Sequence, residues 1–193
     1  MLASITPLGE RSRRQRWPVT VTSLIAGAVL AGGVVGAALG ALGAVMPVAP
    51  AARLEVVLAL VLLGVVFDVR LVGIGLPTHR RQVDDAWLRR YRGWVYGFGF
   101  GAQLGIGVVT IVTTSAVYVT LATEVLALDV RGGCLIGATF GFVRGVTVLA
   151  GARVDSPTRL AAFHRRFYRL ERTAARTAVV AQALVVAAAA ATL

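Results

Sequence analysis

The stretch that decides the fold is residues 19–46, VTVTSLIAGAVLAGGVVGAALGALGAVM, which contains no charged side chain. The hydrocarbon core of a bilayer is about 30 Å thick, and about 20 apolar residues cross it as a helix. A basic segment, residues 1–17, precedes this run. The run is much longer than the apolar region of a secretory signal peptide. We therefore expect a retained first transmembrane helix.

Four further apolar runs follow, at about 54–76, 93–121, 132–152 and 177–193, with short charged connections between them. Hydrophobic residues make up 57% of the chain and charged residues 15%. Soluble domains are about 45–50% apolar and about 25% charged. The sequence therefore predicts an all-α, polytopic transmembrane bundle of about five spans.

The arginines predict the orientation of the chain. Sixteen of the 20 basic residues, all of them Arg, lie in 1–17, 77–92 and 153–176, and the opposite connections hold only Arg53 and Arg131. Basic connections stay in the cytoplasm. We expect a protein of the bacterial plasma (inner) membrane with a cytoplasmic N-terminus and an extracytoplasmic C-terminus. Because the positive charge follows the membrane topology, the net charge of +11 does not indicate nucleic-acid binding.

The order of these segments indicates an internal repeat. Val69-Arg70 and Val143-Arg144 occupy equivalent places in two units, 74 residues apart. We divide the chain into a basic N-terminus (1–17), a first two-helix unit with its cytoplasmic connection (18–92), a second such unit (93–176) and a C-terminal helix (177–193). Both units have the same orientation, unlike the inverted repeats of many transporters.

Glycines recur at helical spacing in two of the runs. Small residues every four positions let two helix backbones approach closely in a membrane. The pattern predicts tight helix packing, either within one chain or with a second copy or another membrane subunit. The glycines in question are Gly32, Gly36, Gly40 and Gly43 in the first run, and Gly97, Gly101 and Gly105 in the third.

A polar stripe is predicted beside the glycines of the third run. At 100° per residue its members lie within about 40° of one direction on a continuous helix. They are Tyr96, Gln103, Thr110, Thr114 and Tyr118. An amide facing lipid would lose its hydrogen bonds, so the stripe is expected to face protein or water. Two readings stay open, hydrogen bonding between helices and a polar path for a solute.

Asp68 and Arg70 in the second apolar run and Arg144 in the fourth are charged residues far from the starts of their runs. Charges inside a membrane normally face the bundle interior and pair. We predict an ion pair between Asp68 and Arg144, while Arg70 can extend its side chain to the interface. The alternative is an anion site built from Arg70 and Arg144.

The second basic connection has an amphipathic pattern. Phe163, Phe167 and Leu170 share one side of the predicted helix, and arginines occupy another. Such a helix is typical of a surface that docks on anionic lipid headgroups, although the arginines could also act as a topology signal alone. The predicted headgroup contacts are Arg165, Arg166, Arg169 and Arg172.

The motifs of several enzyme classes are absent. The chain has no H-E-x-x-H, no Walker A motif and no paired cysteines, since Cys134 is the single cysteine. His79 and His164 have no neighbour at metal-ligand spacing. We therefore expect no metal, no cofactor and no enzymatic activity.

The segment GFGFGAQLG at 97–105, with Thr110 downstream, resembles small bacterial membrane proteins of the CcdA and TauE/SafE-like kind. Those are duplicated helical bundles that relay thiol electrons or export small anions. This chain is shorter and lacks the cysteine pair of a thiol relay. The first hypothesis for its function is a transporter-like bundle for a small solute such as an anion. The alternative is a non-catalytic accessory or assembly subunit of a larger membrane complex.

Overall fold

The computed structural model describes residues 4–47, 49–69, 86–110, 112 and 114–167, with isolated positions up to 180. Every regular element in these ranges is helical, which confirms the all-α class. The elements are α1 (Pro7–Ser12), α2 (Trp17–Ala44), α3 (Pro50–Asp68), α4 (Ala86–Arg90), α5 (Gly93–Ile106), α6 (Ala116–Leu126), α7 (Val130–Val146) and the 3-10 helix η1 (Thr147–Gly151). Residues 157–167 are also helical.

In the described part of the chain, two helices are long and apolar enough to cross a membrane, Trp17–Ala44 and Val130–Gly151. They coincide with the first and fourth predicted runs. The second run becomes α3, and its last residues, 70–76, lie outside the described residues. Nearly all of the fifth run, 177–193, also lies outside them.

The predicted continuous helix over 93–121 is wrong. The chain leaves the helix after Ile106 and re-enters it at Ala116. Gly107 has φ +82°, in the left-handed region that glycine favours. The seven residues from Val108 to Thr114 are all β-branched, and such residues lose side-chain freedom in a helix. The glycine and the β-branched run together explain the break.

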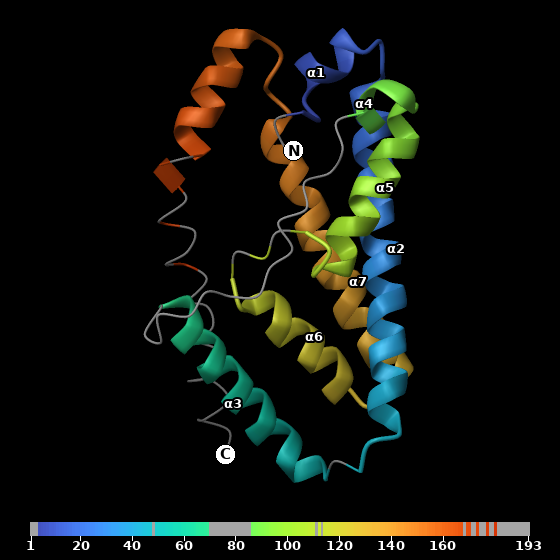
Figure 1. The fold of residues 1–193 in the computed structure, drawn as a ribbon, viewed down its shortest axis with the longest axis vertical. Helices are drawn as coiled ribbons and strands as arrows, with labels where there is room; N and C mark the ends of the chain where they lie inside the picture. The colour runs from blue at the N-terminus through green and yellow to red at the C-terminus, as the bar shows by residue number, and fades with distance from the viewer. Residues whose placement is uncertain are drawn as a thin grey trace.

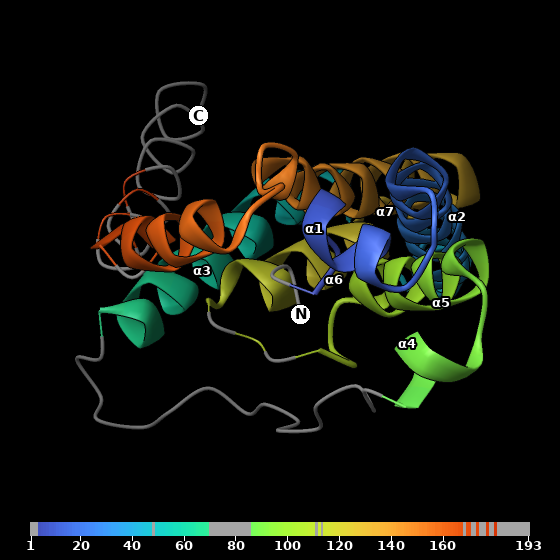
Figure 2. The ribbon, with the colours of Figure 1, turned by 90° about the horizontal axis from the view of Figure 1, so that it is seen from above.

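Helices α2, α5 and α7 form one packed group, in which α5 contacts the N-terminal half of α2 and α7 contacts most of its length (Figure 1). Seen from above, these three helices cluster on one side of the molecule, and α3 lies apart from them (Figure 2). Helix α6 contacts α2, α3 and α7. The break between α5 and α6 therefore connects the α2–α5–α7 group to α3.

The predicted glycines lie at these helix contacts. A Cβ atom added to Gly36 would overlap the carbonyl oxygen of Gly133 on α7, and one added to Gly101 would overlap that of Leu24 on α2. The same holds for Gly32 against Gly137, Gly40 against Asp129, Gly43 against Val125, Gly97 against Thr20, and Gly105 against Ala28. The structure confirms close glycine packing and places it within a single chain.

Candidate functional site at a helix break

Arg144 of α7 forms hydrogen bonds with backbone groups at the end of α5. Its guanidinium group donates hydrogen bonds to the carbonyl oxygens of Leu104 (3.0 Å) and Gly107 (3.4 Å) and to the hydroxyl of Thr110 (2.9 Å). It also lies 5.3 Å from the centre of the Phe140 ring. The last carbonyl groups of a helix lack partners within the helix. The arginine supplies those partners where the helix stops.

Asp68 of α3 accepts hydrogen bonds at the start of α6. Its carboxylate accepts hydrogen bonds from the backbone N–H of Ser115 (2.7 Å) and from the Ser115 hydroxyl (2.9 Å). A helix dipole favours a cation at its C-terminus and an anion at its N-terminus. Arg144 at the end of α5 and Asp68 at the start of α6 satisfy both preferences. The two charges therefore stabilise the break from opposite sides.

The predicted ion pair between Asp68 and Arg144 is wrong. In the described residues, the hydrogen bonds donated by the Arg144 guanidinium group go to residues 104–110, whereas the carboxylate of Asp68 binds Ser115. The prediction assumed a continuous third helix with no unpaired backbone groups. The break provides such groups, and each charge binds those nearest to it. Arg70, the other charge in this set, lies outside the described residues.

The five residues of the predicted polar stripe do not share one helix face. Tyr96 and Gln103 are on α5, Thr110 and Thr114 are in the break, and Tyr118 is on α6. The break brings only Thr110 to Arg144. Gln103 is half-buried, and its amide forms no hydrogen bond within the described residues.

An apolar groove runs beside the break, between α3 and α6. It has a volume of about 290 Å³. Its walls are Leu60, Leu63, Gly64 and Phe67 from α3 and Ser115, Tyr118 and Val119 from the start of α6. Tyr118 of the predicted stripe therefore lies at this groove, and Ser115, which binds Asp68, lies in its wall.

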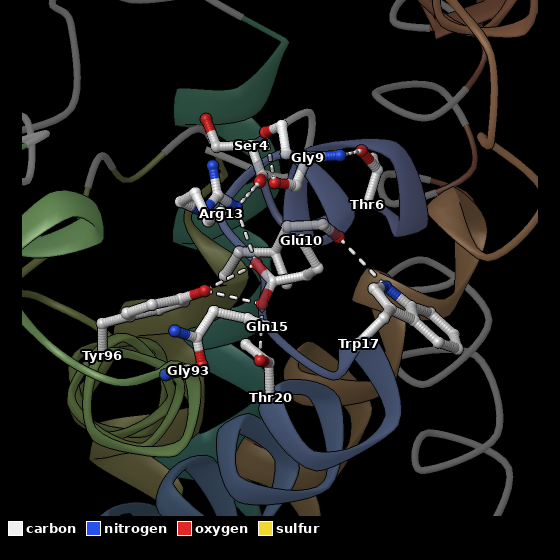
Figure 3. A network of polar contacts seen from close by, with 12 residues as sticks. Ser4, Thr6, Gly9, Glu10, Arg13, Gln15, Trp17, Thr20, Gly93 and Tyr96 are labelled. Carbon is white, nitrogen blue, oxygen red and sulfur yellow. Dashed lines mark hydrogen bonds and ion pairs between the residues drawn. The ribbon is translucent and has the colours of Figure 1, made fainter.

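A second polar cluster lies at the N-terminal end of the bundle and was missed by the sequence analysis (Figure 3). Glu10 of α1 is completely buried. Its carboxylate accepts hydrogen bonds from Arg13 (2.6 Å), Thr20 (2.7 Å) and Tyr96 (2.6 and 2.7 Å). Burial by itself would lower the pKa of Arg13, but its contacts with Glu10 and Tyr96 raise it overall.

The hydrogen bonds of Glu10 connect residues 4–16 to α2 and α5. In addition, the backbone N–H of Gly93 donates to the side-chain oxygen of Gln15 at 3.0 Å, and the N–H of Leu8 donates to the carbonyl of Val154 at 3.0 Å. We call residues 4–16 the N-terminal cap. No periodic pattern indicated this cap, because one acidic residue among many arginines resembles a solvated segment.

Glu124, in the last turn of α6, was also missed. It lies three residues beyond the third apolar run, and 1% of its surface is exposed. Its Oε2 atom is buried and has no hydrogen-bond partner among the described residues. A buried carboxyl group without a partner favours its protonated form.

The predicted lipid-contacting residues lie on the helix over 157–167 and just beyond it. Arg165, Arg166 and Arg169 are exposed, as is Phe167, while Arg172 lies outside the described residues. The rings of Phe163 and Phe167 are 5.8 Å apart. This exposure is compatible with the predicted headgroup contacts, which stay a prediction.

The described residues contain no group of three or more potential metal-ligating side chains. Comparisons of the chain with family models, curated proteins and solved structures found no match. Any assignment of function therefore depends on the residues and their geometry.

Proposed function

We propose that this protein is a transporter-like, multi-pass bundle of the inner membrane that moves a small anionic solute past the α5–α6 break. The main support for this proposal is the position of the Arg144 guanidinium group, which lies at that break. In the described part of the chain its partners are carbonyl groups, a hydroxyl group and a ring, and no carboxylate neutralises its charge. Arg144 is half-buried, and a cation partly withdrawn from water without a counter-ion favours binding of an anion.

The form of the break supports this role. Transporters place their solute sites where a membrane helix is interrupted, since irregular backbone is tolerated in a bilayer only inside the protein or along a cavity. Gln103 lies one turn before Gly107 and has an amide without a hydrogen bond in the described residues. This amide is available to a polar solute.

The proposal includes a membrane topology. In the described part of the chain, α2 and α7 with η1 are the helices long and apolar enough to cross a membrane, and we assign both as spans. We assign α3, the α5–α6 pair and residues 177–193 as the other three spans. The arginine-rich connections lie in the cytoplasm, so the N-terminal cap covers the cytoplasmic end of the bundle.

Reconstitution into liposomes tests the proposal. Purified protein is expected to release trapped radiolabelled anions, tested as a series of chloride, nitrate, formate and sulfate. Arg144→Gln removes the cation and is expected to lower flux more than tenfold, since a buried charge contributes several kcal/mol to the binding of its partner. Arg144→Lys keeps the charge without the planar geometry, and we expect it to retain part of the flux.

Arg131→Gln is the matched control, because Arg131 is an exposed arginine of the same helix. Its flux is expected to equal that of the unchanged protein. Wild-type flux in Arg144→Gln, with an unaltered elution volume and melting temperature, would contradict the site. The absence of flux for every anion tested would contradict transport.

A second candidate function is an accessory subunit, and one observation favours it. Helices α2 and α7 expose large apolar side chains, among them Val34 and Leu135 at 69% each. These outward faces can contact lipid or another membrane protein, whereas the glycine faces are already used within the chain. Mass determination of the complex from native membranes in gentle detergent separates the two. A stable heteromeric complex combined with no flux would favour this candidate.

A further inference from the structure

The starting point is the carboxyl group of Glu124, which no other part of the proposed function uses. Neither of its oxygens forms a hydrogen bond or ion pair within the described residues, and Oε2 is fully buried. Val125, the next residue, packs its carbonyl against Gly43 near the end of α2. Glu124 therefore lies at the end of the bundle opposite the N-terminal cap.

Glu124 points toward the inside of the bundle. Val117 and Glu124 are the buried residues of α6, and residues seven apart share one side of a helix. Val117 approaches Gly107 together with Phe140 of α7, so this side of α6 faces α7. The groove residues Ser115 and Val119 lie on the side that faces α3.

None of the surrounding charged groups neutralises Glu124. Helix α2 has no titratable side chain. Helix α3, which packs against α6, has the titratable side chains Arg53, Glu55 and Asp68. Helix α7 has Arg131, Cys134 and Arg144, and the connection between α6 and α7 has Asp129. The guanidinium group of Arg144 lies at the end of α5 and forms no ion pair with Glu124 in the described residues. The Nε atom of Arg53 is buried without a partner, and Arg53 forms no ion pair with Glu124.

Three kinds of group can neutralise a buried carboxylate: a basic side chain, a metal ion or a proton. Among the described residues, no basic side chain pairs with Glu124. A hard metal ion needs about six oxygen ligands, and the described residues hold no cluster of acidic or other ligating side chains. A proton needs only the carboxylate oxygen itself.

We propose that Glu124 is a proton-binding site in the extracytoplasmic half of the bundle, and that its proton is the coupling ion for the anion transported past Arg144. The O–H bond of the carboxyl group forms when a hydronium ion gives up its proton and breaks when water takes the proton back. For a monovalent anion, one proton moves with one negative charge, so the joint movement is electrically neutral. The coupling rests on the proposed transport function, whereas proton binding does not.

The proton site is tested by carbodiimide labelling of the full-length protein in membranes, since dicyclohexylcarbodiimide reacts with protonated carboxyl groups in apolar surroundings. Mass spectrometry is expected to find an adduct on Glu124 at about pH 5.5 that falls more than tenfold at about pH 8.5. Glu55, which is exposed on α3, serves as the internal control and is expected to stay unlabelled. Labelling of Glu124 that does not change with pH would overturn the site.

Two variants sharpen this measurement. Glu124→Gln keeps the size of the side chain and is expected to remove the adduct. Arg53→Gln is expected to leave its pH dependence unchanged, because Arg53 does not pair with Glu124. If Arg53→Gln instead shifts that dependence, Glu124 is ionised through Arg53, and the proton site is wrong.

Coupling is tested in liposomes with a pH gradient, acidic outside. Inward anion flux is expected to rise at least fivefold over flux at equal pH, and Glu124→Gln is expected to remove this rise. Flux in the unchanged protein that ignores the gradient would overturn coupling while leaving transport in place. If no anion moves at all, the proposed function fails, and the labelling result still decides whether Glu124 binds a proton.

Discussion

Two glycines three residues apart on α2 have very different surroundings. A Cβ atom on Gly36 would overlap the backbone of Gly133, whereas one on Gly33 would meet the Cys134 sulfur at 3.5 Å and the Ala138 Cβ at 3.6 Å, which are ordinary contacts. Side chains can adjust to a new methyl group, but two helix backbones in contact can only move apart.

We therefore expect Gly36→Ala to destabilise the bundle by about 1–3 kcal/mol, the usual range for overpacking. Gly33→Ala is the matched control. It is expected to be neutral or to stabilise the protein by up to about 1 kcal/mol, because alanine favours the helix. Thermal unfolding in detergent measures both. Equal melting temperatures for the two variants would contradict the described contact of α2 with α7.

Glu124 predicts a pH dependence of stability. Its carboxyl group is buried and its Oε2 atom has no hydrogen-bond partner among the described residues, so the folded state favours the protonated form. A carboxyl group whose pKa is raised by folding stabilises the folded state below its unfolded pKa, and this contribution is lost as the pH rises through the folded pKa. The melting temperature is therefore expected to fall between about pH 5 and pH 8.

Glu124→Gln cannot lose a proton and is expected to flatten this pH dependence. Glu55→Gln, which changes an exposed carboxyl group on α3, is expected to leave it unchanged. A melting temperature that falls equally steeply in Glu124→Gln would assign the effect to another group.

At the scale of the element, the break between α5 and α6 depends on Gly107. Its positive φ suits glycine, and an added Cβ would lie 3.1 Å from the Phe140 ring and 3.2 Å from Val117. We expect Gly107→Ala to cost about 1–3 kcal/mol from backbone strain and to lower anion flux, since Gly107 also presents its carbonyl oxygen to Arg144. Unfolding and flux are measured together, with Gly33→Ala as the control. Unchanged values for both would contradict the positive-φ turn.

The same break marks the limit of what the sequence predicted for single elements. Hydrophobicity predicted α2 and α7 well, because a long apolar run is compatible with few structures other than a membrane-spanning or buried helix. It failed over 93–121, because β-branched residues are as apolar as helix-forming ones. The seven such residues after Gly107 were the available signal, and reading them as a helix break would have separated Thr110 from Tyr118.

At the scale of the whole molecule, cysteine labelling tests the topology. On a Cys134→Ser background, Arg89→Cys and Arg166→Cys are expected to react with a membrane-impermeant maleimide only from the cytoplasmic side. Arg131→Cys, in the opposite connection, is expected to react only from the outside. Inverted and right-side-out vesicles distinguish the sides. Reaction of all three from one side would contradict the multi-pass arrangement.

The global assembly was predictable only in part. Glycine spacing predicted close helix contacts, but spacing on one helix cannot identify the partner, and only the structure matches Gly36 to Gly133. The charges of the candidate site were also predicted as residues, while their partners were not. Arg144 and Asp68 find their partners through the path of the backbone, which no periodic pattern encodes. The buried Glu10 had no signal at all.

The seam where α2 meets α7 has a mechanical consequence. Interlocking side chains resist sliding of one helix along another. The glycines leave few such side chains at this interface, so that peptide groups of the two helices touch directly. Such a surface tolerates a small shift along the helix axis more easily than a tilt, because tilting drives one backbone into the other. If α7 moves relative to α2, Arg144 is therefore expected to shift parallel to the axis of α2.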